Sequence, residues 1–248
     1  MNEIEHRPWP CPKRLWVARQ DWTELTFLHW RVPHEVLRAQ IPKELEIDTY
    51  QGDAWLGLVP FRMENVRFRF TPKVPWLSSF PELNVRTYVK HRGKPGVYFF
   101  SLDAASRLMV WIGRQFFHLP YFNASMKNTP QPSGWQYLSA RKCSAAGERR
   151  FVARQRFSQD VFLAKSGSVE HFLTERYCLY SLDKGGYVLC SEVHHVPWPL
   201  RCGEIEIEEN TMLAGFGIDS SRAPDLVHAS DGVEVTGWWP ERPINDTL

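Results

Sequence analysis

Glu82, Asn84, Arg86 and Tyr88 form a row of polar residues that could act together if a single strand carries them. Alternate residues of a β-strand point to the same face, so the four side chains would lie next to one another. A carboxyl group can hold or transfer a proton and a guanidinium can bind a carboxylate, so this row suits an acidic ligand. Because buried charges need partners, the row is either ordinary solvent-facing surface or the lining of a pocket.

A second set of basic residues follows within an apolar, helix-patterned run. Arg114 and His118 lie 7 and 11 positions after Arg107, close to whole helical turns, so the three side chains share one stripe. If this stripe faces a pocket, it could bind a carboxylate or a phosphate. The alternative is that Arg114 pairs with a structural carboxylate such as Glu82 or Glu175.

Tyr121 follows this stripe directly. A phenol can donate a proton to a carbonyl compound, or polarise it, when a neighbouring cation lowers the phenol's pKa, and Arg114 and His118 are close in sequence. The alternative is that Tyr121 only packs against the body of the protein. We predict Tyr121 and Glu82 as catalytic residues, and Arg86, Arg114 and His118 as substrate-binding residues.

The elements that would position these residues are mainly strands, because β-branched and aromatic residues dominate the short apolar runs. The expected strands are residues 25–30, 54–61, 66–70, 83–89, 97–102, 135–142, 150–157, 176–182, 187–193, 204–208 and 233–239. A Pro/Ser/Asn-rich loop is expected over residues 123–134.

One long helix is expected over Asp103–Phe117, with Asp103 as its N-cap and Leu108, Ile112 and Phe116 as its buried stripe. Two short helices are expected near residues 33–41 and 168–175. Strands do not alternate regularly with helices, so we predict a mainly β (β-rich α+β) fold, closed or sandwich-like, with one helix packed on it.

Residues 113–122 resemble a segment of acetoacetate decarboxylase that carries two lysines. In that enzyme the first lysine attacks the substrate carbonyl, and the second helps to hold its partner uncharged. Those positions are Tyr121 and Phe122 here, and a tyrosine cannot form an imine. Residues 31–48 resemble the same family's early helix, and Glu82 fits one of its active-site glutamates, whereas Thr23 and Trp55 stand near the places of its other two polar residues.

The chain is more closely similar to the YqjF-like group of uncharacterised bacterial proteins (domain of unknown function 2071). The matching segments are residues 55–61, 82–89, 96–103, 172–177 and 194–200. This resemblance implies an acetoacetate-decarboxylase-like β barrel with no established activity. Because acetoacetate decarboxylases form oligomers, it also implies a possible homo-oligomer.

The composition excludes several classes of function. A formal charge of +2 and a pI near 8.3 do not favour a nucleic-acid partner. No run approaches the ~20 apolar residues of a membrane helix, and the polar first residues lack a signal peptide's apolar core. We expect a cytoplasmic protein without a membrane partner. It would form a single domain over 1–248, with an extended arm at 1–20, where Trp9 packs on the body, and a frayed tail at 240–248.

The cysteine and histidine patterns predict neither a metal nor a cofactor. His194 and His195 are adjacent, so on a strand they point to opposite faces and cannot easily bind one ion. The segment 215–218 lacks the third glycine of a dinucleotide fingerprint. Five cysteines at irregular spacings give no disulfide framework. Cys178 and Cys190 flank a turn and could face each other, but without an export signal we expect them to be reduced.

The main functional hypothesis is an uncharacterised protein that holds a small, possibly acidic metabolite in a β-barrel pocket, without the Schiff-base lysine of acetoacetate decarboxylase. One alternative is a lysine-independent enzyme that acts on a carbonyl or carboxylate compound by acid/base chemistry; a perturbed pKa at Glu82 or Tyr121 would favour it. The other is a structural or assembly protein whose interior is filled by aromatic side chains, with no cavity of the ~300 Å³ typical of ligand sites.

Overall fold

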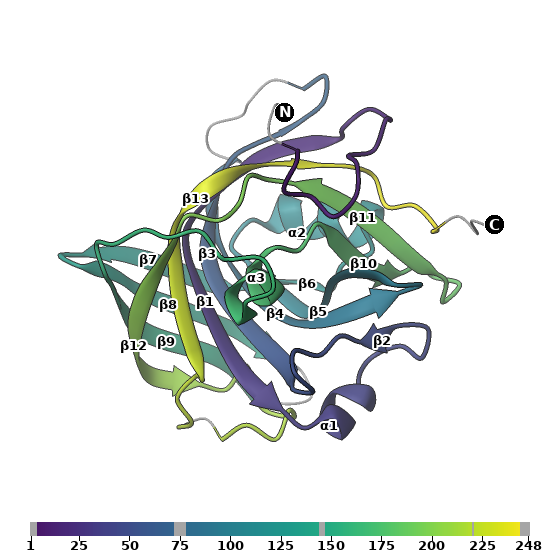
Figure 1. The fold of residues 1–248 in the computed structure, drawn as a ribbon. Helices are drawn as coiled ribbons and strands as arrows, with labels where there is room; N and C mark the ends of the chain where they lie inside the picture. The colour runs from purple at the N-terminus through teal and green to yellow at the C-terminus, as the bar shows by residue number, and fades with distance from the viewer. Residues whose placement is uncertain (1–3, 72–77, 144–146, 220, 244–248) are drawn as a thin grey trace.

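The computed structural model describes residues 4–71, 78–143, 147–219 and 221–243, which form a strand-rich fold with three helices (Figure 1). The helices are α1 (His34–Arg38), α2 (Arg107–Phe116) and α3 (Val169–Thr174). The strands are β1 (Ala18–Val32), β2 (Glu46–Ile47), β3 (Ala54–Phe68), β4 (Phe80–His91), β5 (Lys94–Ala104), β6 (Tyr121–Asn123), β7 (Ser125–Gln131), β8 (Gly134–Cys143), β9 (Gly147–Phe157), β10 (Cys178–Leu182), β11 (Val188–His194), β12 (Leu200–Asn210) and β13 (Leu226–Gly237).

Seven strands pair into a ring. They follow the order β1-β3-β4-β5-β10-β11-β13, and β13 pairs back with β1 along almost its whole length. From β13 the sheet continues through β12, β9 and β8 to the edge strand β7. Figure 1 shows this second part beside β1 and β3, with α2 on the side of the ring where β10 and β11 lie.

The ring strands are long and irregular, which lets them curl. β1 shifts register against β3 between Thr23 and Leu28, and β4 shifts against β5 between Val85 and Arg86. Such bulges bend a strand and increase its twist, so a sheet can turn back on itself. At the closure, Gly232 has φ +132°, and a Cβ there would lie 2.2 Å from the carbonyl oxygen of Trp22. The ring closes where only glycine fits.

The buried side chains fall into two clusters on opposite faces of the ring strands. Leu56 and Leu58 of β3 face the cluster that also contains Tyr137 and Phe151 of β8 and β9. Trp55, Val59 and Phe61 of the same strand face the other cluster, together with Val110 of α2 and residues of β4, β5, β11 and β13. β3 is therefore apolar on both faces, as expected for a strand covered on both sides.

Several sequence predictions about α2 and its surroundings are wrong. The helix begins at Arg107, Ser106 is the N-cap that accepts from the Met109 N–H, and Asp103 belongs to β5. Leu108 and Phe116 are exposed, whereas Val110 and Gly113 are buried. The run is apolar on several faces, so its periodicity could not identify the side that packs on the sheet.

The predicted loop at residues 123–134 is in fact the end of β6, β7 and the turn into β8. β7 lies at the edge of the sheet, where a proline such as Pro130 is tolerated because no neighbour needs its missing N–H. The other predicted strands, and both short helices, overlap strands and helices of the structure, although their ends differ by several residues and the predicted strands 54–61 and 66–70 belong to the single strand β3.

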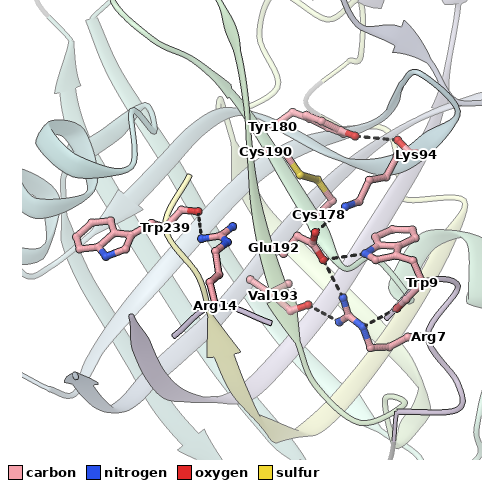
Figure 2. The surroundings of a disulfide bond; sticks show 10 residues. All are labelled: Arg7, Trp9, Arg14, Lys94, Cys178, Tyr180, Cys190, Glu192, Val193 and Trp239. Atoms are coloured by element: carbon pink, nitrogen blue, oxygen red, sulfur yellow. Dashed lines mark hydrogen bonds and ion pairs between the residues drawn. A yellow bond between two sulfur atoms is a disulfide. The ribbon is translucent and has the colours of Figure 1, made fainter. Parts of the chain in front are cut away.

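The two ends of the chain are attached to the ring. Trp9 of the N-terminal arm packs on the core and donates its indole N–H to Glu192 of β11, as Figure 2 shows. Glu241 exchanges backbone hydrogen bonds with Cys190, so this part of the predicted tail is paired rather than frayed. Residues 244–248 lie outside the described part of the chain.

A disulfide joins Cys178 of β10 to Cys190 of β11 (Figure 2). The expectation that both thiols are reduced is therefore wrong for this structure. Their Cα atoms are 6.2 Å apart, within the range that a disulfide spans. Cys11 and Cys202 are free, and the side chain of Cys143 lies outside the described residues. None of the described helices is long and apolar enough to span a bilayer.

Candidate functional site

The candidate site is a cavity of about 120 Å³ enclosed by the ring. Each of the seven ring strands contributes lining residues, and α2 covers the cavity with Met109, Ile112 and Gly113, together with its C-cap residue Phe117. Most of the lining is apolar, and its large residues include Phe27, Phe61, Phe80, Phe99 and Trp198. This volume is below the ~300 Å³ at which small-molecule sites usually begin, and aromatic side chains fill much of the ring, which is the feature that the structural or assembly alternative predicts.

Glu82 of β4 lies in this cavity and is only 1% exposed. Burial raises the pKa of its carboxyl group to about 8, and the nearby Asp103 adds to the rise, while hydrogen bonds from Tyr121 and Asn84 oppose it. Glu82 is therefore mostly protonated at neutral pH. A neutral carboxyl can both donate and accept a hydrogen bond, and a pKa near the working pH suits proton transfer.

Tyr121 places its hydroxyl 3.3 Å from each carboxyl oxygen of Glu82. Its ring lies against α2 at Gly113, where an added Cβ would sit 2.3 Å from the Tyr121 ring. This contact explains why a glycine stands in the middle of the helix. Burial and the Glu82 carboxyl raise the pKa of Tyr121 well above its usual value, so the prediction that Arg114 and His118 lower it is wrong.

A layer of polar residues supports Glu82 from behind. Tyr137 of β8 donates its hydroxyl to the Glu82 carbonyl oxygen at 2.6 Å. Asp103 is fully buried beside Arg141, with an Nη1–Oδ1 distance of 3.1 Å, and burial raises its pKa to about 6. Sequence reasoning missed Asp103 as part of the site because its place before an apolar run resembled a helix N-cap.

Arg86 lines the cavity four residues after Glu82 on β4. Its Nη2 atom donates to the Leu173 carbonyl at 3.1 Å, and its guanidinium lies 5.5 Å from the centre of the Phe27 ring. Among the described residues, no carboxylate lies within ion-pair distance of Arg86. Arg176, the cavity's other arginine, is 2.7 Å from Asp48. Arg86 is thus the lining cation with no carboxylate partner in the described chain.

Four lining side chains carry a buried polar atom without a hydrogen-bond partner among the described residues. These atoms are Trp22 Nε1, Asn84 Oδ1, Arg86 Nε and Trp198 Nε1. Buried polar atoms are nearly always hydrogen-bonded, so a water molecule or a ligand in the cavity would satisfy these four atoms; twelve further atoms of this kind lie on described residues that do not line the cavity. The predicted inward direction of the polar row is confirmed for Glu82, Asn84 and Arg86.

The structure does not bring all five predicted site residues together. Arg114 is exposed, and its Nε atom donates to the Tyr121 carbonyl at 2.5 Å on the outer side of α2. His118 lines the same surface hollow as Arg114, next to Asp183 and Lys184. The expectation that both residues face the interior beside Glu82 is wrong, because α2 turns its Met109–Gly113 side to the ring.

The sequence analysis also considered a metal site at His194 and His195 and a catalytic lysine. The ring Nδ1 of His195 lies 2.8 Å from the Val196 carbonyl, and burial lowers the pKa of His195 to about 3. Within the described chain, no three His, Cys, Asp or Glu side chains gather in a way that could hold a metal ion. No lysine is present among the described residues that line the cavity.

This architecture is that of the acetoacetate-decarboxylase-like proteins. Acetoacetate decarboxylase from Legionella pneumophila superposes with a TM-score of 0.63 at 11% identity, over 97% of this chain and 94% of that chain. The enduracididine biosynthesis enzyme MppR, solved in complex with pyruvate, superposes with a TM-score of 0.57 at 12% identity, over 96% of this chain and 91% of that chain. At this identity the likeness establishes the fold alone.

The sequence identifies the family more narrowly. Residues 19–234 match the DUF2071 family, described as "Uncharacterized conserved protein (COG2071)". The uncharacterized protein YqjF of Bacillus subtilis (strain 168) is 42% identical over 231 residues, which are 93% of this chain and 94% of that protein. The chain belongs to the DUF2071 family, as its sequence motifs predicted.

Proposed function

We propose that this protein binds a small organic acid with a carbonyl group, such as a 2-oxo acid, inside a closed β-barrel formed by the strand ring. Arg86 binds the carboxylate, and the carbonyl oxygen accepts hydrogen bonds from Glu82 and Tyr121. The observation that carries this proposal is the position of Arg86, a cation with no carboxylate partner in the described chain, four residues from a carboxyl group that burial keeps neutral.

The charges in the cavity favour an anion over a cation. An ionised Glu82 would repel a carboxylate, but the raised pKa leaves it protonated at neutral pH. Arg86 then contributes a positive charge in apolar surroundings, where a charged hydrogen bond is strong. A cavity of about 120 Å³ has room for a few heavy atoms, given that one water needs roughly 10–15 Å³. The pyruvate complex of MppR supports the same class of ligand.

The first experiment measures binding of pyruvate, and of the neutral ketone acetone, by calorimetry at pH 7. Arg86→Gln is expected to weaken pyruvate binding by about 10- to 100-fold, the usual loss of a charged hydrogen bond, and to leave acetone binding little changed. Arg107→Gln, an exposed arginine on α2, is the matched control and is expected to bind as the original protein does. Equal losses in both variants, or no binding of any oxo acid, would contradict the proposal.

The ligand is held without a covalent bond in this proposal, because the described lining contains no lysine. Borohydride added to the protein with pyruvate or acetoacetate is therefore expected to leave its mass unchanged. A stable mass increase would show an imine and would overturn the non-covalent reading.

A second candidate function is proton transfer to and from the bound carbonyl compound, and Glu82 favours it. In the minor fraction of molecules in which Glu82 is ionised at neutral pH, its carboxylate would remove an α-proton from the bound compound, the enolate oxygen would accept a hydrogen bond from Tyr121, and the protonated Glu82 would return the proton to carbon. Exchange of pyruvate methyl protons in deuterated water, followed by NMR, is expected to be catalysed and to disappear in Glu82→Gln. Exchange that persists in this variant would exclude Glu82 as the residue that transfers the proton. Binding of pyruvate without any exchange would indicate a protein that binds its ligand without catalysing proton transfer.

A further inference from the structure

Five exposed large apolar side chains line one hollow beside the cavity, on the outer side of α2. We name the hollow between them the apolar groove; its volume is about 650 Å³. Its exposed members include Phe70 at 90%, Leu15 at 64% and Trp111 at 53%. The full lining is Arg14, Leu15, Trp16, Val17, Phe68, Arg69, Phe70, Trp111, Ile112, Phe116, Trp239 and Glu241.

The apolar groove and the cavity share part of their walls. Phe68 and Ile112 line both spaces, so the two lie on either side of the same residues. Adjacent residues in the sequence line different spaces. Phe117 and Trp238 line the cavity, whereas Phe116 and Trp239 line the groove. For one molecule to occupy both spaces, its chain must pass this shared wall at Phe68 and Ile112.

One of the two cations in the apolar groove is paired with a carboxylate, and the other, Arg69, is covered by aromatic rings and has no ion-pair partner among the described residues. Arg14 lies 2.9 Å from Glu241 and donates to the Trp239 carbonyl oxygen at 2.8 Å, the second contact being visible in Figure 2. Arg69 lies over the rings of Trp16 and Phe70 at 4.9 and 5.1 Å. Nine of the twelve lining residues are apolar, so the groove offers mainly apolar surface, which suits a hydrocarbon chain.

We infer that the ligand is amphipathic: its oxo-acid head lies in the cavity, and an apolar tail of several carbons lies in the apolar groove. This inference rests on the proposed function and names its substrate class. The cavity alone is too small for more than a short acid, whereas the adjoining groove is several times larger and buries the hydrophobic part. Contiguous exposed apolar patches of this kind usually mark a binding surface.

The test is a chain-length series of straight-chain 2-oxo acids, from pyruvate to 2-oxooctanoate, measured by calorimetry below their aggregation concentrations. Each added methylene that becomes buried is expected to tighten binding by about 4-fold until the groove is filled. In Trp111→Ala the ratio between the affinities for 2-oxooctanoate and pyruvate is expected to fall by at least about 10-fold. Leu163→Ala, which removes an exposed leucine that lines neither space, is the control and keeps the original ratio.

The outcomes separate this inference from the proposed function. Pyruvate binding with no gain along the series would overturn the tail site and leave the proposed function standing. A gain that survives in Trp111→Ala would place the tail elsewhere and also overturn the inference. If no oxo acid of any length binds, both statements fail. If sedimentation instead shows a dimer that Trp111→Ala dissociates, a second copy of the chain covers the groove, and the tail site is wrong.

Discussion

Glu82 is unusual because the fold keeps a carboxyl group in apolar surroundings and supplies polar partners without a cation. Tyr121 contacts both of its oxygens, and Tyr137 binds its backbone carbonyl. The arginine on the same strand, Arg86, lies far enough away to bind other groups, Leu173 and Tyr88. Burial therefore determines the protonation state of Glu82, and under the proposed function Glu82 and Arg86 offer a ligand a hydrogen-bond donor and a cation.

The raised pKa of Glu82 predicts how stability changes with pH. In the unfolded chain its pKa is near 4.5 and in the folded protein about 8, so the folded state binds the proton more tightly. The stabilisation is fully present below pH 4.5 and is lost as pH rises towards 8, by up to about 1.4 kcal/mol per pH unit. Urea unfolding between pH 5 and 8 is expected to show this decline in the original protein and a smaller one in Glu82→Gln.

The control for this titration is Glu234→Gln, which neutralises an exposed glutamate on β13, another strand of the ring. This variant should keep the decline of the original protein. Asp103, with a folded pKa of about 6, adds a decline of its own between its ordinary value and pH 6 in all three proteins. An identical pH dependence in the original protein and Glu82→Gln would mean that the carboxyl is not held neutral.

At the scale of elements, the sequence predicted the strand that carries the site better than the helix that covers it. Polar residues alternate along β4, and a period of two places Glu82, Asn84 and Arg86 on one face without further information. In α2 the apolar residues spread around the helix, so the stripe of Arg107, Arg114 and His118 had no unique direction. Gly113 could have indicated which side of α2 packs on the ring, since a glycine inside a helix often marks a close contact.

Other elements escaped prediction because their signals depend on position in the sheet. β7 contains a proline and several polar residues, which indicate a loop, yet an edge strand with one solvated face accepts both. The disulfide between Cys178 and Cys190 could be recognised as a possible pairing across the hairpin, but its oxidation state could not be read from spacing. The proximity of Asp103 to Glu82 could not be predicted from the sequence, because it depends on how β4 and β5 align.

At the scale of the whole molecule, the cavity exists because the first long strand meets the last one. β1 and β13 are separated by most of the chain, and no local pattern predicts that they pair from Ala18–Gly237 to His29–Leu226. If the pairing between β1 and β13 were broken, the cavity would be open to water. Glu82 would then be hydrated, and the pKa of its carboxyl group would fall towards the usual value.

Gly232 provides a test of the pairing between β1 and β13. A Cβ at this position would lie 2.2 Å from the Trp22 carbonyl oxygen and 2.9 Å from the Thr23 Cα, and both obstacles are backbone atoms of β1. Gly232→Ala is therefore expected to lower the free energy of unfolding by at least about 2 kcal/mol, beyond the cost of its positive φ alone. Gly52→Ala is the matched control, because Gly52 also has a positive φ but has no atom within 4 Å of the added Cβ. Equal losses in urea unfolding for the two variants would mean that β1 and β13 do not approach this closely and that the ring is open there.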